Sequence, residues 1–123
     1  MNVLDSIVTQ AASIASLRRD IHAYPELCFQ EVRTADLVAT KLTEWGIPIH
    51  RGLGTTGVVG IVKSGTSSRA IGLRADMDAL PMQEFNTFDH ASKHAGKMHA
   101  CGHDGHTAML LAAAQHFSKN RNF

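Results

Sequence analysis

The chain has 123 residues, of which 44% are hydrophobic and 19% are charged, a balance typical of one globular domain rather than of a disordered chain. Twelve Lys and Arg residues against eleven Asp and Glu residues give a net charge of +1, and their scatter along the sequence argues against nucleic-acid or anionic-membrane partners. No apolar run approaches the roughly 20 residues that span a bilayer, and the N-terminus lacks the pattern of a secretory signal, so we expect a cytoplasmic protein.

Three segments have the apolar spacing or composition of helices. Residues 3–23 repeat apolar side chains at helical spacing and predict one amphipathic helix. Residues 30–45 predict a second helix, with Gly46 in the place of a C-terminal cap. Residues 104–119 are strong helix formers, and Asp104 is expected to be the N-cap of this third helix.

Between these helices, three short segments are rich in β-branched or apolar residues and are separated by Gly and Ser. They predict strands at residues 47–51, 57–64 and 70–76. The stretch "GLGTTG", residues 52–57, also matches the G-x-G-x-x-G pattern of dinucleotide-binding loops, with Asp76 near the place of a ribose-binding acid. That pattern requires a helix to start at the glycines, whereas the next residues favour a strand. We therefore interpret residues 52–57 as a tight β-turn.

The densest cluster of polar side chains is "HACGHDGH", residues 99–106. Cys101 and His103 are two positions apart, so in an extended segment both would project to one side, where a thiolate and an imidazole can bind one transition-metal ion. Gly102 between them adds no side chain that would crowd the metal. His106 is a candidate third ligand or an inward-facing residue of the first helical turn. The alternative is a polar loop without chemistry, which is the usual setting of a single exposed histidine.

A second candidate region precedes this cluster, in "GLRADMDALPMQE". Asp76 and Asp78 lie at the end of a predicted strand, and their shared parity directs both carboxylates to one face. Two such charges require a nearby cation, either a metal ion or a histidine that a metal already holds. The alternative is a solvated turn in which an Asp acts as a cap.

The two cysteines, Cys28 and Cys101, do not form the framework of a disulfide-rich protein. A cysteine beside histidines can instead be a nucleophile with a histidine base, so a thiol enzyme using Cys101 remains an alternative. Metal ions would protect a ligand thiol from iodoacetamide, whereas a nucleophile would react quickly without any dependence on metal.

Four motifs occur in one order in this chain: "DIHAYPEL", "TTGVVG", "GLRADMDALPMQE" and "KMHACGHDGHTAMLLAAA". From about residue 17 to residue 117, the succession resembles the N-terminal part of the metal-dependent amidohydrolases that include hippurate hydrolase, N-acyl-L-amino acid aminoacylases and plant auxin-conjugate hydrolases. The resemblance implies an α/β fold with a mixed central sheet flanked by helices. Residues 1–123 would form the N-terminal portion of the catalytic domain, without the inserted dimerisation domain, and a homodimer is expected only of a full-length protein.

The same resemblance implies a hydrolase that cleaves the amide bond of N-acyl-amino acids, which are small-molecule substrates. Two divalent metal ions per complete site are expected, Mn or Zn, with Co or Ni as alternatives. Cys101 and His103 match the family's metal ligands, and Asp78 matches an aspartate that supports the site. The wider superfamily has a histidine at the position of Asp76. The hippurate hydrolase branch shares this chain's departure from that pattern. Asp76 and His106 are therefore the candidates for additional ligands or for groups that hydrogen-bond to them.

Family members are much longer than this chain, and their paired glutamates, which supply the general base and a ligand, have no counterpart here. The glutamates present, including Glu84, belong to other motifs. We therefore expect the chain by itself to be inactive as a hydrolase. A metal-binding or interaction fragment without turnover is the alternative function.

Overall fold

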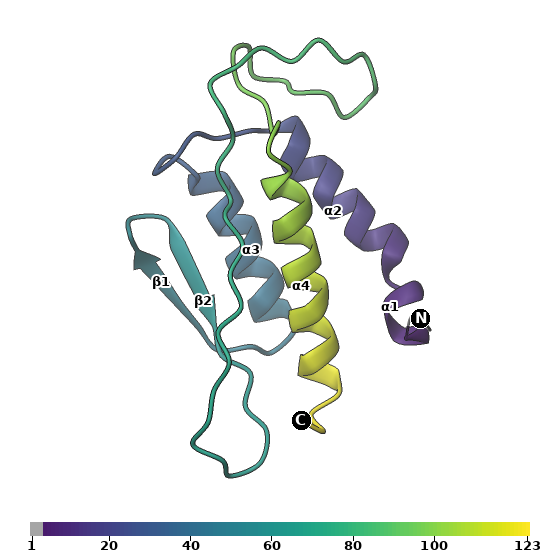
Figure 1. Cartoon of the computed structure of the whole chain (residues 1–123), viewed down its shortest axis with the longest axis vertical. Helices are drawn as coiled ribbons and strands as arrows, with labels where there is room; N and C mark the ends of the chain where they lie inside the picture. The colour runs from purple at the N-terminus through teal and green to yellow at the C-terminus, as the bar shows by residue number, and fades with distance from the viewer. Residues whose placement is uncertain (1–3) are drawn as a thin grey trace.

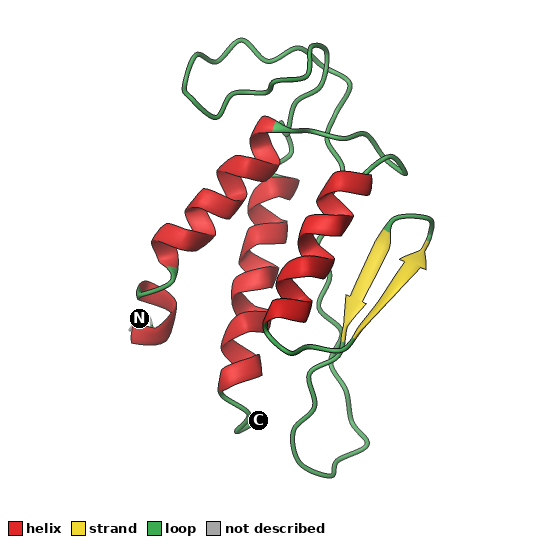
Figure 2. Cartoon of the chain, turned by 180° about the vertical axis from the view of Figure 1, so that it is seen from behind, coloured by secondary structure: helices red, strands yellow, loops and turns green. Residues whose placement is uncertain are grey.

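The computed structural model describes residues 4–123 and contains four helices and one hairpin (Figure 1). The helices are α1 (Asp5–Val8), α2 (Ala11–Ala23), α3 (Val32–Glu44) and α4 (His103–Lys119). The strands are β1 (Ile49–Leu53) and β2 (Gly57–Gly60). Figures 1 and 2 show α4 between α2 and α3, with the hairpin beside α3 and long loops at both ends of the helical layer.

The N-terminal helix is interrupted, so the single helix predicted over residues 3–23 is only partly correct; residue 3 lies outside the described residues. The chain turns at Thr9 and Gln10, where the Thr9 hydroxyl donates a hydrogen bond to the Ser6 carbonyl oxygen at 3.2 Å. A short polar side chain that bonds to a nearby carbonyl competes with the helical pattern, and a β-branched residue weakens the helix further. The apolar periodicity of the sequence therefore continues across the residues where the helix is interrupted.

Helix α3 confirms the second predicted helix, with bounds that are two residues shorter at the start and one shorter at the end. Gly46 has a φ of +70°, which a glycine adopts without the strain that a side chain would add. The Gly46 N–H donates to the Thr43 carbonyl oxygen at 2.9 Å and closes the end of the helix. The expected C-terminal cap is therefore present.

The segment after Leu53 forms a turn between two antiparallel strands, as expected for "GLGTTG". Ile49 pairs with Gly60 and Arg51 with Val58. The strand predicted at 47–51 is therefore present but shifted by two residues, and the strand predicted at 57–64 is present in shortened form. Gly60 lies against helix α3, because a Cβ there would meet Leu42 Cδ1 at 3.2 Å. No helix starts at these glycines, so the dinucleotide-loop alternative is wrong.

The strand predicted at residues 70–76 is absent: the segment is an extended loop within the part of the chain that the structure describes. A strand requires partners for its N–H and C=O groups, and none of the described residues supplies a ladder beside it. Ile71 is 90% exposed and Leu73 61% exposed. Local composition favoured a strand here, but strand formation depends on a neighbour that lies elsewhere in the fold.

The hydrophobic core lies between α3, α4 and the start of the hairpin. Its buried centre consists of Val38, Leu42, Ile47 and Leu111, with Trp45 among the partly buried side chains around it. The chain is therefore of the mixed α/β class, as predicted, although its described sheet has two antiparallel strands and not a mixed central sheet. Within residues 4–123, no helix combines the length and apolar character needed to cross a membrane.

Candidate metal centre

His103 and Asp78 are in direct contact although 25 positions separate them. The Nδ1 atom of His103 lies 2.9 Å from the Asp78 carbonyl oxygen and 3.0 Å from Asp78 Oδ1. Both partners are acceptors, so Nδ1 donates and the lone pair of the neutral ring is on Nε2. A carboxylate that holds one ring nitrogen and leaves the other free is the usual environment of a metal-binding histidine.

Cys101 is exposed and lies two residues before His103, but the segment between them is not extended. Gly102 has a φ of +80° and a ψ of 17°, in the left-handed region, and is the N-cap of α4. The expectation that an extended backbone aligns Cys101 and His103 is therefore wrong in its geometry, because α4 begins at His103. Cys101 nevertheless lies two residues before α4, and His103, the first residue of that helix, contacts the loop that carries Asp78.

Asp76 is paired with an arginine. Arg74 Nη2 lies 2.6 Å from Asp76 Oδ1, and the side chain of Asp76 is 45% exposed. The hydrogen bond and the charge of Arg74 lower the pKa of Asp76. A guanidinium thus supplies the positive charge that the sequence required beside Asp76. A ligand role for Asp76 stays a prediction.

His106 is exposed on the first turn of α4, so the inward-facing alternative is wrong. Its ring centroid lies 5.9 Å from that of His103, which places the two imidazoles side by side on one surface. A position three residues after His103 on a helix produces this arrangement. His106 remains a candidate for an additional ligand or for a group that contacts one.

The donors present fit part of a metal site. A thiol and an imidazole with a free Nε2 are suitable ligands for Zn²⁺ and related ions. Residues 4–123 contain no group of three or more His, Cys, Asp or Glu side chains arranged to hold a metal ion. Cys101 also makes no hydrogen bond to a histidine among these residues, so the geometry gives no support to a thiol nucleophile with a histidine base.

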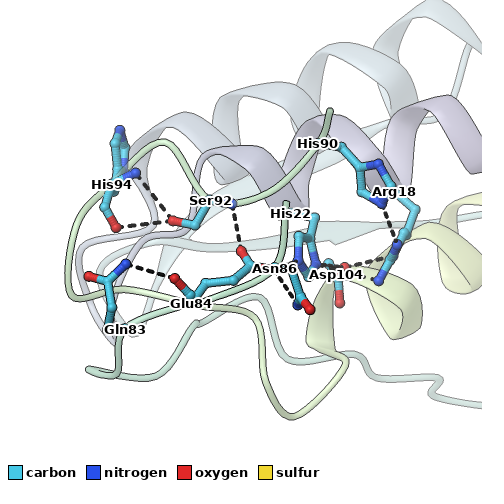
Figure 3. Close-up of polar contacts among 9 residues, drawn as sticks. All are labelled: Arg18, His22, Gln83, Glu84, Asn86, His90, Ser92, His94 and Asp104. Atoms are coloured by element: carbon cyan, nitrogen blue, oxygen red, sulfur yellow. Dashed lines mark hydrogen bonds and ion pairs between the residues drawn. The ribbon is translucent and has the colours of Figure 1, made fainter. Parts of the chain in front are cut away.

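A buried polar cluster lies behind this surface, and sequence reasoning did not identify it (Figure 3). His22 Nδ1 lies 2.7 Å from Asp104 Oδ2, and His22 Nε2 lies 3.2 Å from Glu84 Oε1. Arg18 Nε lies 2.7 Å from the same Asp104 oxygen. The expected N-cap role of Asp104 is wrong, because its carboxylate turns inward and makes no cap hydrogen bond.

A signal for the burial of Asp104 is present in the sequence. Asp104, Ala108 and Leu111 have the spacing i, i+4, i+7, which places them on one face of a helix. All three are buried in the structure, and Asp104 is 0% exposed. A charged residue in register with an apolar face indicates a buried partner of opposite charge. The residues that contact Asp104, Arg18 and His22, could not be identified from spacing.

His99 is a further buried residue beside this cluster, at 4% exposure. Its ring centroid lies 6.2 Å from that of His22, and neither of its nitrogens has a hydrogen-bond partner among residues 4–123. Burial, which disfavours the charged ring, lowers the pKa of His99. The imidazole of His99 is thus enclosed by the fold.

The model of peptidase family M20/M25/M40 matches residues 72–123. The hippurate hydrolase of Campylobacter jejuni is 49% identical over 123 residues, which cover 100% of this chain and 32% of that protein. The N-acyl-L-amino acid amidohydrolase of Geobacillus stearothermophilus is 48% identical over 110 residues, which cover 89% of this chain and 30% of that protein.

The fold is also present in solved structures. A Bacillus subtilis protein described as a dinuclear metal binding peptidase from the M20 family superposes with a TM-score of 0.88 at 40% identity, covering 94% of this chain and 33% of that one. The chain thus spans about a third of the length of the relatives that it matches.

Proposed function

We propose that this chain, which matches the model of peptidase family M20/M25/M40 over residues 72–123 and about a third of the length of its amidohydrolase relatives, contributes metal ligands to an amidohydrolase that cleaves N-acyl-amino acids. The observation that carries the proposal is the contact of His103 Nδ1 with Asp78, which leaves Nε2 available to a metal ion. Residues 1–123 are then the N-terminal portion of the catalytic domain.

In this proposal Cys101 and His103 hold the metal, which is Mn or Zn with Co or Ni as alternatives. When bound, the metal ions supply a Lewis acid for the substrate carbonyl and lower the pKa of a bound water. Asp78 fixes the tautomer and orientation of His103 through two acceptor oxygens, one from its backbone and one from its side chain. Asp78 thereby makes Nε2 a stronger electron-pair ligand for the cation.

The 123 residues by themselves are proposed to lack hydrolase activity. A catalytic metal site usually has about three protein ligands per ion and a base that accepts the proton of the attacking water. The residues of this chain that match the family provide two ligands and the supporting Asp78. Glu84 is a candidate base by residue type alone, but its carboxylate is buried and hydrogen-bonded to His22.

Metal binding is tested by titrating Co²⁺ into the purified chain and following the thiolate-to-cobalt absorption and the heat of binding. Cys101→Ala is expected to abolish the thiolate band, and His103→Ala to weaken binding. Cys28→Ala is the matched control, since Cys28 is the chain's other cysteine and is also exposed. Unchanged stoichiometry and affinity in both site variants would show that the metal site lies elsewhere.

Activity is tested with N-benzoylglycine and N-acetylmethionine in the presence of Mn²⁺ or Zn²⁺. We expect no turnover from the 123-residue chain, and hydrolysis of blocked amino acids by a longer protein that contains it. Turnover by the chain itself, lost in Cys101→Ala, would show that its own residues complete a working site. Hydrolysis of unblocked peptides alone by the longer protein would contradict the proposed substrate class.

A further inference from the structure

The buried cluster joins three segments that are distant in the sequence. His22 lies near the end of α2, Glu84 lies in the loop that follows Asp78, and Asp104 lies in the first turn of α4. Figure 3 shows His22 between the two carboxylates, with Arg18 approaching Asp104 from the same helix as His22. One imidazole therefore connects α2, the loop and the start of α4.

Both ring nitrogens of His22 have partners inside the protein. The side chains of His22, Glu84 and Asp104 are 4%, 2% and 0% exposed. Each ring nitrogen of His22 thus has a carboxylate oxygen as its hydrogen-bond partner. Burial alone would raise the pKa of Glu84, but hydrogen bonds from Asn86, Ser92 and His22 outweigh it and hold the pKa below its ordinary value.

The cluster is directly connected to the proposed ligands. Asp104 follows His103 in the chain, so the contacts of its carboxylate with His22 and Arg18 set the rotation of the first turn of α4. The turn is closed by the His106 N–H, which donates to the Gly102 carbonyl oxygen at 3.0 Å. With Asp104 directed inward, the neighbouring His103 ring is directed toward Asp78.

The loop side is held by the same cluster. Leu80 and Met98 exchange two backbone hydrogen bonds, of 2.9 and 3.0 Å, which join the segment after Asp78 to the segment before Cys101. Glu84 lies four residues after Leu80 and is hydrogen-bonded to His22. His22 thus contacts both segments on which the His103–Asp78 pair depends.

We propose that His22 is a positioning residue, which holds Asp104 and Glu84 so that Cys101 and His103 are presented to the metal and His103 stays bonded to Asp78. The inference rests on the proposed function for its metal readout. The hydrogen bond between His103 and Asp78 does not depend on any metal, because it is present in the chain itself. The effect of His22 on this bond can therefore be tested without metal.

The experiment compares His22→Gln with two controls in two measurements. His116→Gln is the matched histidine control, at the opposite end of α4, where it is bonded to Ser6. Val38→Ala is the stability control, because Val38 belongs to the apolar core and not to the cluster. The measurements are the ¹⁵N NMR signals of the His103 ring in metal-free protein and the Co²⁺ affinity of the Cys101–His103 site.

In His22→Gln we expect the His103 ring signals to move away from those of a ring with a proton on Nδ1, and the Co²⁺ affinity to fall about tenfold. Loss of a group that supports metal ligands typically weakens binding by about 10–100-fold, and His22 acts through one further residue. Both controls are expected to leave the ring signals and the affinity unchanged. Glu84→Gln, which keeps an oxygen acceptor for His22, is expected to produce a smaller change of the same kind and is the variant to use if His22→Gln does not fold.

Two outcomes would overturn the proposal. The first is a folded His22→Gln protein whose His103 signals match the wild type. The second is a shift as large in Val38→Ala at an equal loss of stability, which would show that the cluster only stabilises the fold. If the wild-type chain binds no Co²⁺, the metal ligands of the proposed function are wrong. The NMR measurement still decides the role of His22 in that case.

Discussion

The side chain of Glu26 replaces the missing cap of helix α3, and removing it is expected to destabilise the protein. The residue in the N-cap position, Glu31, makes no side-chain cap hydrogen bond. Glu26 Oε1 instead accepts a hydrogen bond from the Arg33 N–H at 3.0 Å, and Oε2 accepts from the Thr34 N–H and hydroxyl, both at 2.8 Å. Three donors at the start of the helix therefore depend on one carboxylate.

The structure indicates which of these contacts matter. Thr34 is 0% exposed, so in Glu26→Ala its two donors lose their partner and water cannot replace it. An unsatisfied buried donor costs about 1–3 kcal/mol, whereas the more accessible Arg33 N–H can be hydrated. We therefore expect Glu26→Ala to lower the free energy of unfolding by about 3 kcal/mol. Thr34→Val removes only the hydroxyl and is expected to cost about 1 kcal/mol.

The assay is urea unfolding at neutral pH, followed by circular dichroism at 222 nm. With a urea dependence of about 2 kcal/mol per molar, the midpoint of Glu26→Ala should fall by about 1.5 M. Glu44→Ala is the matched control, because Glu44 forms an exposed i,i+3 pair with Lys41 that is expected to contribute less than about 0.5 kcal/mol. A loss in Glu26→Ala no larger than that in Glu44→Ala would refute the capping argument.

Three further predictions concern the site and its surroundings. Asp78→Asn should weaken Co²⁺ binding about tenfold in the titration above, because the Asp78 carbonyl oxygen still orients His103 while the anionic charge is lost; an unchanged affinity would show that the charge is irrelevant. The lowered pKa of Glu84 means that its stabilisation is present above its ordinary pKa of 4.5 and is lost as the pH falls through the folded-state value. Urea unfolding between pH 5 and about pH 3.5 should therefore show a steeper loss in the wild type than in Glu84→Gln, and equal slopes would contradict this. Gly102→Ala should cost about 1 kcal/mol in thermal unfolding because of its left-handed φ, whereas Gly72→Ala, which has neither a positive φ nor a close neighbour, should not; equal melting temperatures would be evidence against strain at Gly102.

Local features of the sequence were sufficient to predict α3, α4 and the β1–β2 turn. These elements depend on hydrogen bonds and side-chain spacing within a few residues, which a linear sequence contains. The motif around Cys101 and His103 was also recognisable, because residue types suited to metal binding cluster within eight positions. Residue type and order thus identified the candidate ligands before their geometry was known.

Only the tertiary structure decided how those residues are arranged. His22 meets Asp104 across 82 positions and Glu84 across 62, and no local pattern specifies which buried charges pair over such separations. The left-handed backbone at Gly102 replaced the extended segment expected there, because α4 starts at His103. Residues 70–76 have strand composition yet no ladder, since a strand exists only where a second segment accepts and donates its backbone hydrogen bonds.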